Sequence, residues 1–94
     1  MDVEVKLTGT LAARTGTHRA RIGVNDDATV GDVVDALTDD YGPQVSAGVL
    51  DGNRLRSDTV VVREAEERPL SLRSELHSGD TVRFQLTARV RPTG

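Results

Sequence analysis

One amphipathic helix in the middle of the chain constrains the fold more than any other feature. Apolar side chains form a single stripe at helical spacing within residues 29–41, namely Val30, Val33, Val34, Leu37 and Tyr41. A helix with one apolar stripe is stable only when it buries that stripe against another element. The flanking segments must therefore supply a partner surface.

Residues with defined chemistry mark both ends of this helix. Thr29 is the expected N-cap, because its hydroxyl can accept from the free amides of the first turn. Asp32 follows three residues later, where its carboxylate can reach back and complement the helix dipole. Gly42 and Pro43 are expected to end the helix.

Alternation of apolar and polar residues predicts two strands before the helix. The segments are VEVKL and RARIGV, and their expected inward residues are Val3, Val5, Leu7, Ala20, Ile22 and Val24. We predict that TGTLAARTGTH, residues 8–18, is a polar connection that makes these strands a hairpin.

The second half of the chain predicts further strands. TVVVRE is a strand, and RPLSL is its short partner across the polar turn EAEE. The stretch at 44–58 is ambiguous apart from the turn signal DGN. TVRFQLTARV alternates over residues 81–90, with Arg83 and Arg89 on the polar face. We therefore predict an α+β fold in which a mixed four- to five-stranded sheet packs on one main helix at about 29–41.

Composition excludes several classes of function. The chain has no cysteine, which excludes disulfides, thiolate catalysis and iron–sulfur ligation. Its net charge of −3 provides no general attraction to nucleic acid. The sequence contains neither an apolar run of membrane-spanning length nor the pattern of a signal peptide. We expect a cytoplasmic protein with no nucleic-acid or membrane partner.

No constellation of side chains indicates catalysis or metal binding. His18 and His77 are distant in sequence, and each lies in a polar segment, where a solvated histidine is the ordinary reading. The glycines of LTGTLAARTG lack the Lys-Ser/Thr of a phosphate-binding loop. We expect no metal site, no bound cofactor and no catalytic residue, so this protein is not predicted to be an enzyme.

Three short patterns carry a resemblance to a known family. They are ARTG at 13–16, DATVGDVVDAL at 27–37 and LHSGDTVRF at 76–84. In this order they resemble the ubiquitin-like β-grasp family, and within it the MoaD/ThiS-type sulfur carriers and the small archaeal modifier proteins. The resemblance covers essentially the whole chain and implies a β-grasp domain at 1–90 followed by a tail at 91–94.

The resemblance implies a function for the tail residues Arg91, Pro92, Thr93 and Gly94. In this family an activating enzyme uses ATP to adenylate the carboxylate of a C-terminal glycine. That carboxylate then becomes a thiocarboxylate or is joined to lysines of target proteins. The implied partners are an ATP-dependent activating enzyme and either target proteins or a sulfur-accepting synthase subunit. Gly94 is the residue that matches the activated glycine.

The tail also departs from the family pattern. Thr93 stands where the family has a second glycine, and its β-branched side chain is stiff at χ1. A β-grasp module that binds partners without being conjugated is therefore an alternative. A synthase subunit that supplies its tail to a catalytic partner is another. Arg83 and Arg89 are candidate contacts for an acidic partner surface, and the simpler alternative is a solvated face interleaved with Glu and Asp.

Overall fold

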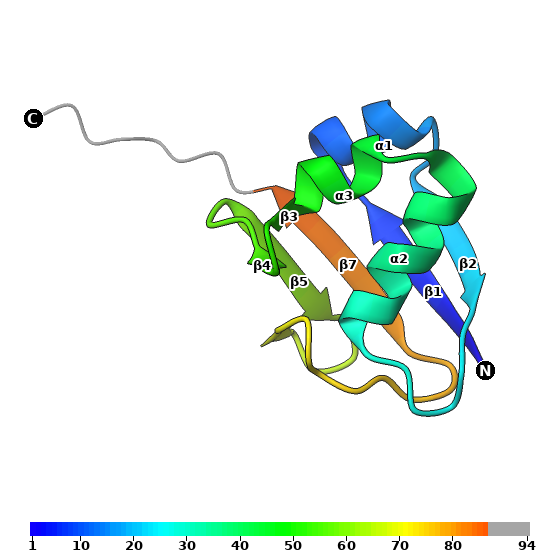
Figure 1. Cartoon of the computed structure of the whole chain (residues 1–94). Helices are drawn as coiled ribbons and strands as arrows, with labels where there is room; N and C mark the ends of the chain where they lie inside the picture. The colour runs from blue at the N-terminus through cyan, green and yellow to red at the C-terminus, as the bar shows by residue number, and fades with distance from the viewer. Residues whose placement is uncertain (87–94) are drawn as a thin grey trace, which may run out of the picture.

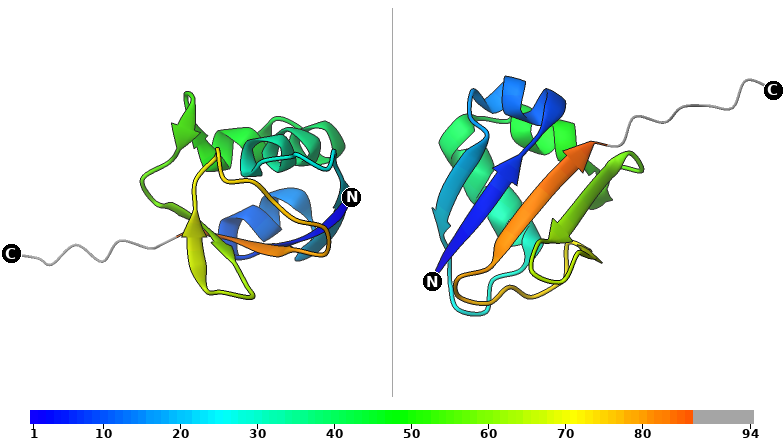
Figure 2. Two further views of the ribbon diagram at one scale, coloured as in Figure 1. Left: turned by 90° about the horizontal axis from the view of Figure 1, so that it is seen from below. Right: turned by 180° about the vertical axis from the view of Figure 1, so that it is seen from behind.

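The computed structural model describes residues 1–86 of the chain. The elements, in chain order, are β1 (Asp2–Leu7), α1 (Gly9–Thr15), β2 (Arg19–Gly23), α2 (Val30–Tyr41), α3 (Gln44–Val49), β3 (Leu50–Asp51), β4 (Arg54–Leu55), β5 (Thr59–Arg63), β6 (Arg68–Leu70) and β7 (Thr81–Leu86). The helices lie over one face of the sheet and leave the other face uncovered (Figures 1 and 2). This two-layer arrangement confirms the predicted α+β class.

The main sheet has five strands in the order β2-β1-β7-β5-β6. The middle strand β7 pairs parallel with β1, whereas β1–β2, β5–β7 and β5–β6 are antiparallel. The sheet is therefore mixed, as predicted. Strands β3 and β4 form a separate two-stranded sheet.

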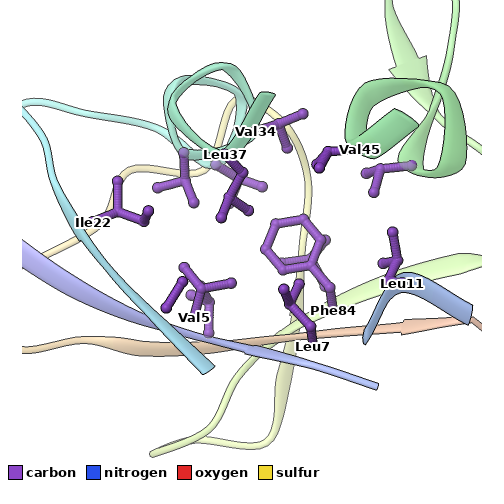
Figure 3. Packing of buried hydrophobic residues seen from close by; sticks show 14 of the residues in the cluster. Val5, Leu7, Leu11, Ile22, Val34, Leu37, Val45 and Phe84 are labelled. Atoms are coloured by element: carbon purple, nitrogen blue, oxygen red, sulfur yellow. The ribbon is translucent and has the colours of Figure 1, made fainter. Parts of the chain in front are cut away.

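The alternating pattern of the strands places one set of side chains under the helices. Val3, Val5 and Leu7 of β1 are at most 1% exposed. They meet Val34 and Leu37 of α2 in a continuous core (Figure 3). Burial of one such aliphatic side chain contributes about 1.5–3 kcal/mol. The core also encloses Phe84 of β7, which is fully buried.

Helix α2 begins and ends as predicted. The backbone N–H of Thr29 donates to Asp32 Oδ2 at 2.9 Å, which is the reaching-back contact expected of a capping box. The apolar stripe is buried through Leu37, and Tyr41 is half-buried at the end of the helix. The chain turns at Gly42, whose φ of 101° is accessible to glycine.

Two helices were not predicted. Residues 8–18 were expected to be a polar connection, which is wrong, because Gly9–Thr15 forms α1. The helix is short and shows only part of an apolar stripe, and Leu11 and Ala12 stabilise it by burial in the core. The ambiguous stretch beginning at residue 44 forms α3, which likewise buries Val45 and Val49.

The turns agree with the sequence signals. The DGN segment connects β3 to β4, and the EAEE segment lies between β5 and β6. Before β7, Gly79 takes a φ of 83°. The Asp80 carboxylate then accepts from the His77 N–H at 2.8 Å and from Arg63 Nε at 3.2 Å. This small network fixes the start of β7.

Candidate functional site

The sheet face that carries no helix is a candidate surface, and we call it the open face. The strand register identifies the residues of this face. Each of them either alternates with buried core residues along its strand or lies opposite another open-face residue on a neighbouring strand. They are Glu4, Lys6, Arg19, Arg21, Val60, Val62, Glu64, Thr81, Arg83 and Gln85.

Ion pairs cross the open face from strand to strand. Lys6 Nζ of β1 lies 2.7 Å from Glu64 Oε1, just after β5, so this pair connects elements on the two sides of β7. Arg83 Nη2 of β7 lies 3.5 Å from Glu67 Oε2. Within the β1–β2 pair, Arg19 Nε lies 3.9 Å from Glu4 Oε1. The open face is therefore mainly charged.

Glu64 is the one acid in residues 1–86 with a clearly shifted pKa. The hydrogen bond from Lys6 lowers the pKa of Glu64, partial desolvation opposes this, and the charges of Lys6, Arg83 and Arg19 lower it further. Glu64 Oε2 and Arg83 Nε are shielded from solvent and find no hydrogen-bond partner among the described residues. The neighbouring basic groups thus favour the carboxylate form of Glu64.

The charged character fades toward one edge of the sheet. Lys6 lies opposite Arg83, Arg83 opposite Val62, and Val62 opposite Pro69. Val62 is 7% exposed and Pro69 is exposed. A partner on this face would meet basic groups over β2, β1 and β7 and apolar groups over β5 and β6.

The central strand β7 leads to the tail that the sequence singled out. Leu86, its last residue, pairs with Thr59, and the Thr8 hydroxyl donates to the Phe84 carbonyl oxygen at 3.1 Å. The structure places Arg83 on the open face, as predicted from its parity. The remaining candidates lie outside the described residues: Arg89, Arg91, Pro92, Thr93 and Gly94.

The histidines do not come together with other ligands. His18 lies between α1 and β2, and His77 lies in the turn before β7, and both are exposed. Within residues 1–86, no group of three or more His, Asp and Glu side chains is arranged to hold a metal ion. In the same part of the chain, no helix combines the length and the apolarity that crossing a membrane requires.

Comparison with known proteins identifies the fold. Neither a family model nor a curated protein matches the sequence. Solved structures match over nearly the whole chain. Small archaeal modifier protein 1 of Haloferax volcanii is 28% identical, with a TM-score of 0.81 over 93% of this chain and 98% of that chain. This protein has the ubiquitin-like β-grasp fold of the small archaeal modifiers and sulfur carriers.

More distant structures show the same β-grasp fold. A putative molybdopterin converting factor subunit 1 from Pyrococcus furiosus is 19% identical, with a TM-score of 0.74 over 94% of this chain and 99% of that chain. A chain of the Amycolatopsis orientalis BexX/CysO complex is 18% identical, with a TM-score of 0.76 over 95% of this chain and 99% of that one. The predicted fold family is confirmed.

The sequence patterns that carried the resemblance now have structural roles. ARTG at 13–16 is the end of α1 and its left-handed cap Gly16, rather than a loop. The pattern at 27–37 starts α2, and the pattern at 76–84 contains the turn that starts β7. The Lys6–Glu64 pair was missed. Alternation put Lys6 on the open face, but only the order of β1, β7 and β5 brings it to Glu64.

Proposed function

We propose that this β-grasp protein is a ubiquitin-like protein modifier or sulfur carrier that is activated at Gly94. The observation that carries the proposal is the match to small archaeal modifier protein 1, at 28% identity over 93% of this chain. The position of β7 supports it, because the chain continues toward Gly94 from the middle strand of the sheet. The function would reside in the carboxylate of that glycine, with the domain serving as the recognised carrier and not as a catalyst.

The proposed chemistry requires ATP and an activating enzyme. The Gly94 carboxylate attacks the α-phosphate of ATP, which forms an acyl-adenylate and releases pyrophosphate. A sulfide donor then displaces AMP and leaves a thiocarboxylate, or a lysine amine of a target displaces AMP and forms an amide. Glycine suits this role because the absence of a Cβ lets a chain pass through a narrow channel. The domain itself would bind no cofactor.

The open face is the proposed docking surface for the activating enzyme. Arg83 lies on the middle strand, upstream of Gly94 on the same chain segment, and its side chain is 24% exposed. Its partner Glu67 is 73% exposed, so an acidic group of the enzyme can replace it at small cost. A mainly basic surface over β2, β1 and β7 would orient the tail by charge complementarity.

Adenylation can be tested without knowing any target. The protein is incubated with ATP, labelled pyrophosphate and activating enzymes of the MoaD/ThiS-type and archaeal-modifier systems. We expect exchange of label into ATP with the intact chain and none with a chain lacking Gly94. Thr93→Gly should raise the rate, since it removes the β-branched side chain beside Gly94. Equal exchange with and without Gly94 would contradict the proposal.

One observation favours a second candidate function. Thr93 stands where the family pattern has glycine, which is what a β-grasp module would show if it bound partners through its surface alone. Such a module would retain its partners when residues 92–94 are deleted. A synthase subunit would instead co-purify with a catalytic partner and lose sulfur transfer in the same deletion. Pull-down with the full and shortened chains separates these outcomes.

A further inference from the structure

A cavity of about 310 Å³ lies on the helix side of the sheet edge, away from the open face. It is bounded by the β3–β4 hairpin and by the chain that leaves β6. Figure 1 shows this hairpin continuing directly from the end of α3, on the side of the molecule where β5 lies. Its lining residues are Asn53, Arg54, Leu55, Leu70, Ser71, Leu72 and Arg73.

Three leucines form the apolar wall of the cavity. Leu55, Leu70 and Leu72 each pack against the core yet remain half-exposed. Single exposed apolar residues are ordinary on a protein surface, but three around one hollow form a patch of the kind that binds partners.

Backbone pairing holds this wall in place. Leu55 is opposite Leu50 in the hairpin, and Leu70 is opposite Val61 in the main sheet. The carbonyl oxygen of Leu72 accepts from the Gly31 N–H at 3.0 Å, at the start of α2. The cavity therefore needs little rearrangement to accept an apolar side chain, which favours binding.

The rim of the cavity is positively charged. Arg54 and Arg73 line it, both are exposed, and neither has a carboxylate partner within residues 1–86. This distinguishes them from the arginines that form ion pairs in the same part of the chain, namely Arg19, Arg56, Arg63, Arg68 and Arg83. Two arginines without an ion pair in residues 1–86 thus flank an apolar hollow on a protein whose net charge is −3, and Asp51 lies opposite Arg54 across the hairpin.

We propose that this cavity binds a peptide segment of a partner protein in which bulky apolar residues are flanked by aspartate or glutamate. The leucines would take the apolar side chains, and Arg54 and Arg73 would pair with the carboxylates. The protein's own residues 87–94 are a poor match, because they contain Arg89 and Arg91 and no acidic side chain. The inference does not depend on activation of Gly94.

The site offers recognition independent of the open face. Leu70 is opposite Val61, which is buried under the helices, so the cavity and Arg83 lie on opposite sides of the sheet. A carrier with both surfaces could bind a receptor peptide in the cavity while its open face binds another protein.

The probe is a short fluorescent peptide with a Leu-Ile pair flanked by aspartates. Matched peptides carry asparagines in place of the aspartates, or serines in place of the apolar pair. Binding to the intact chain is followed by anisotropy, and by amide shifts of Leu55, Leu70, Leu72 and Arg73. The protein variants are Arg54→Glu with Arg73→Glu, and Arg14→Glu as control, since Arg14 is another exposed arginine with no ion pair in residues 1–86.

We expect the aspartate peptide to bind and both matched peptides to bind weakly. Charge reversal at Arg54 and Arg73 should weaken binding roughly tenfold, while Arg14→Glu leaves it within about twofold. The reversed variant should instead prefer a peptide with lysines in place of the aspartates. Absence of binding, shifts confined to the open face, or equal affinity for the aspartate and asparagine peptides would overturn the proposal. Self-association mapped by shifts at the three leucines would assign the cavity to a second copy and also overturn it.

Discussion

The two faces of the sheet differ in what they contain and in what holds them together. The covered face presents Val5, Leu7 and Phe84, all at most 1% exposed, to the helices. The open face carries charges on the same strands, and these charges pair across strands through contacts such as Lys6–Glu64. Adjacent residues on one strand therefore belong to different environments, because side chains alternate with a period of two.

This difference teaches where stability and recognition reside. Apolar burial contributes kilocalories per side chain, whereas exposed ion pairs contribute roughly 0–1 kcal/mol. The covered face thus accounts for the fold, and the open face can change its charges at little cost to folding. Substitutions of neighbouring residues on one strand should separate the two roles.

The largest contrast is expected between Phe84 and Gln85, which are adjacent on β7. Phe84→Ala removes a fully buried ring from the centre of the core and should destabilise the fold by about 3–5 kcal/mol. Gln85→Ala, on the open face, should change stability by less than about 1 kcal/mol. Urea unfolding followed by circular dichroism measures both. Similar losses for the two variants would break the distinction between the faces.

The turn before β7 should give an intermediate effect. Asp80→Ala removes the carboxylate that accepts two hydrogen bonds, one from the backbone N–H of His77 and one from the charged side chain of Arg63. Hydrogen bonds to a charged group contribute about 1.5–3 kcal/mol, so a loss in that range is expected in the same unfolding assay. Asp39→Ala, at an exposed helix position, serves as the control and should have little effect. Equal effects would mean that Asp80 is not the anchor of this turn.

A charge reversal on the open face should affect recognition more than folding. Arg83→Glu loses the ion pair with Glu67 and also the attraction between Arg83 and Glu64, so a stability cost of about 1 kcal/mol is expected and is measured by unfolding beside the exchange assay. If the activating enzyme docks there, the rate of pyrophosphate exchange at low protein concentration should fall about tenfold. Arg14→Glu on α1 should leave the rate unchanged. Unaltered exchange with Arg83→Glu would move the docking site elsewhere.

The smallest predicted effect is a shift in one titration. Lys6 is the main cause of the lowered pKa of Glu64, so Lys6→Met should raise that pKa toward its ordinary value. Carbon-detected NMR titration of the Glu64 carboxyl measures the change, and Arg21→Met is the matched control. A Glu64 titration unaffected by Lys6→Met would contradict the ion pair.

The same pair has a defined effect on acid stability. Because the pKa of folded Glu64 is lowered, its contribution is present above the pKa of an unfolded glutamate, roughly 4.3, and is lost as pH falls through the folded value. Lys6→Met should therefore reduce the dependence of stability on pH in the acid range. Unfolding curves on both sides of that range provide the comparison.

Local patterns predicted the elements that depend on one periodicity. The stripe of α2 and the alternation of β1 and β7 were sufficient to place the core, and Thr29 with Asp32 marked the helix start. Helix α1 could not be predicted in this way, because its stability comes from burying Leu11 and Ala12 under distant elements. The alternation along each strand was sufficient to assign residues to the open face. Its ion pairs and the cavity at Leu55 and Leu70 were not predictable, because they depend on which strands become neighbours.

The most direct test of the carrier function is the mass of the intact chain after activation. The protein is incubated with ATP, sulfide and the activating enzyme that supports exchange, and the products are measured by mass spectrometry with fragmentation. The account predicts replacement of one oxygen by sulfur, located at Gly94, and no such product when Gly94 is deleted. An unchanged mass despite turnover of a known carrier in the same mixture would contradict it.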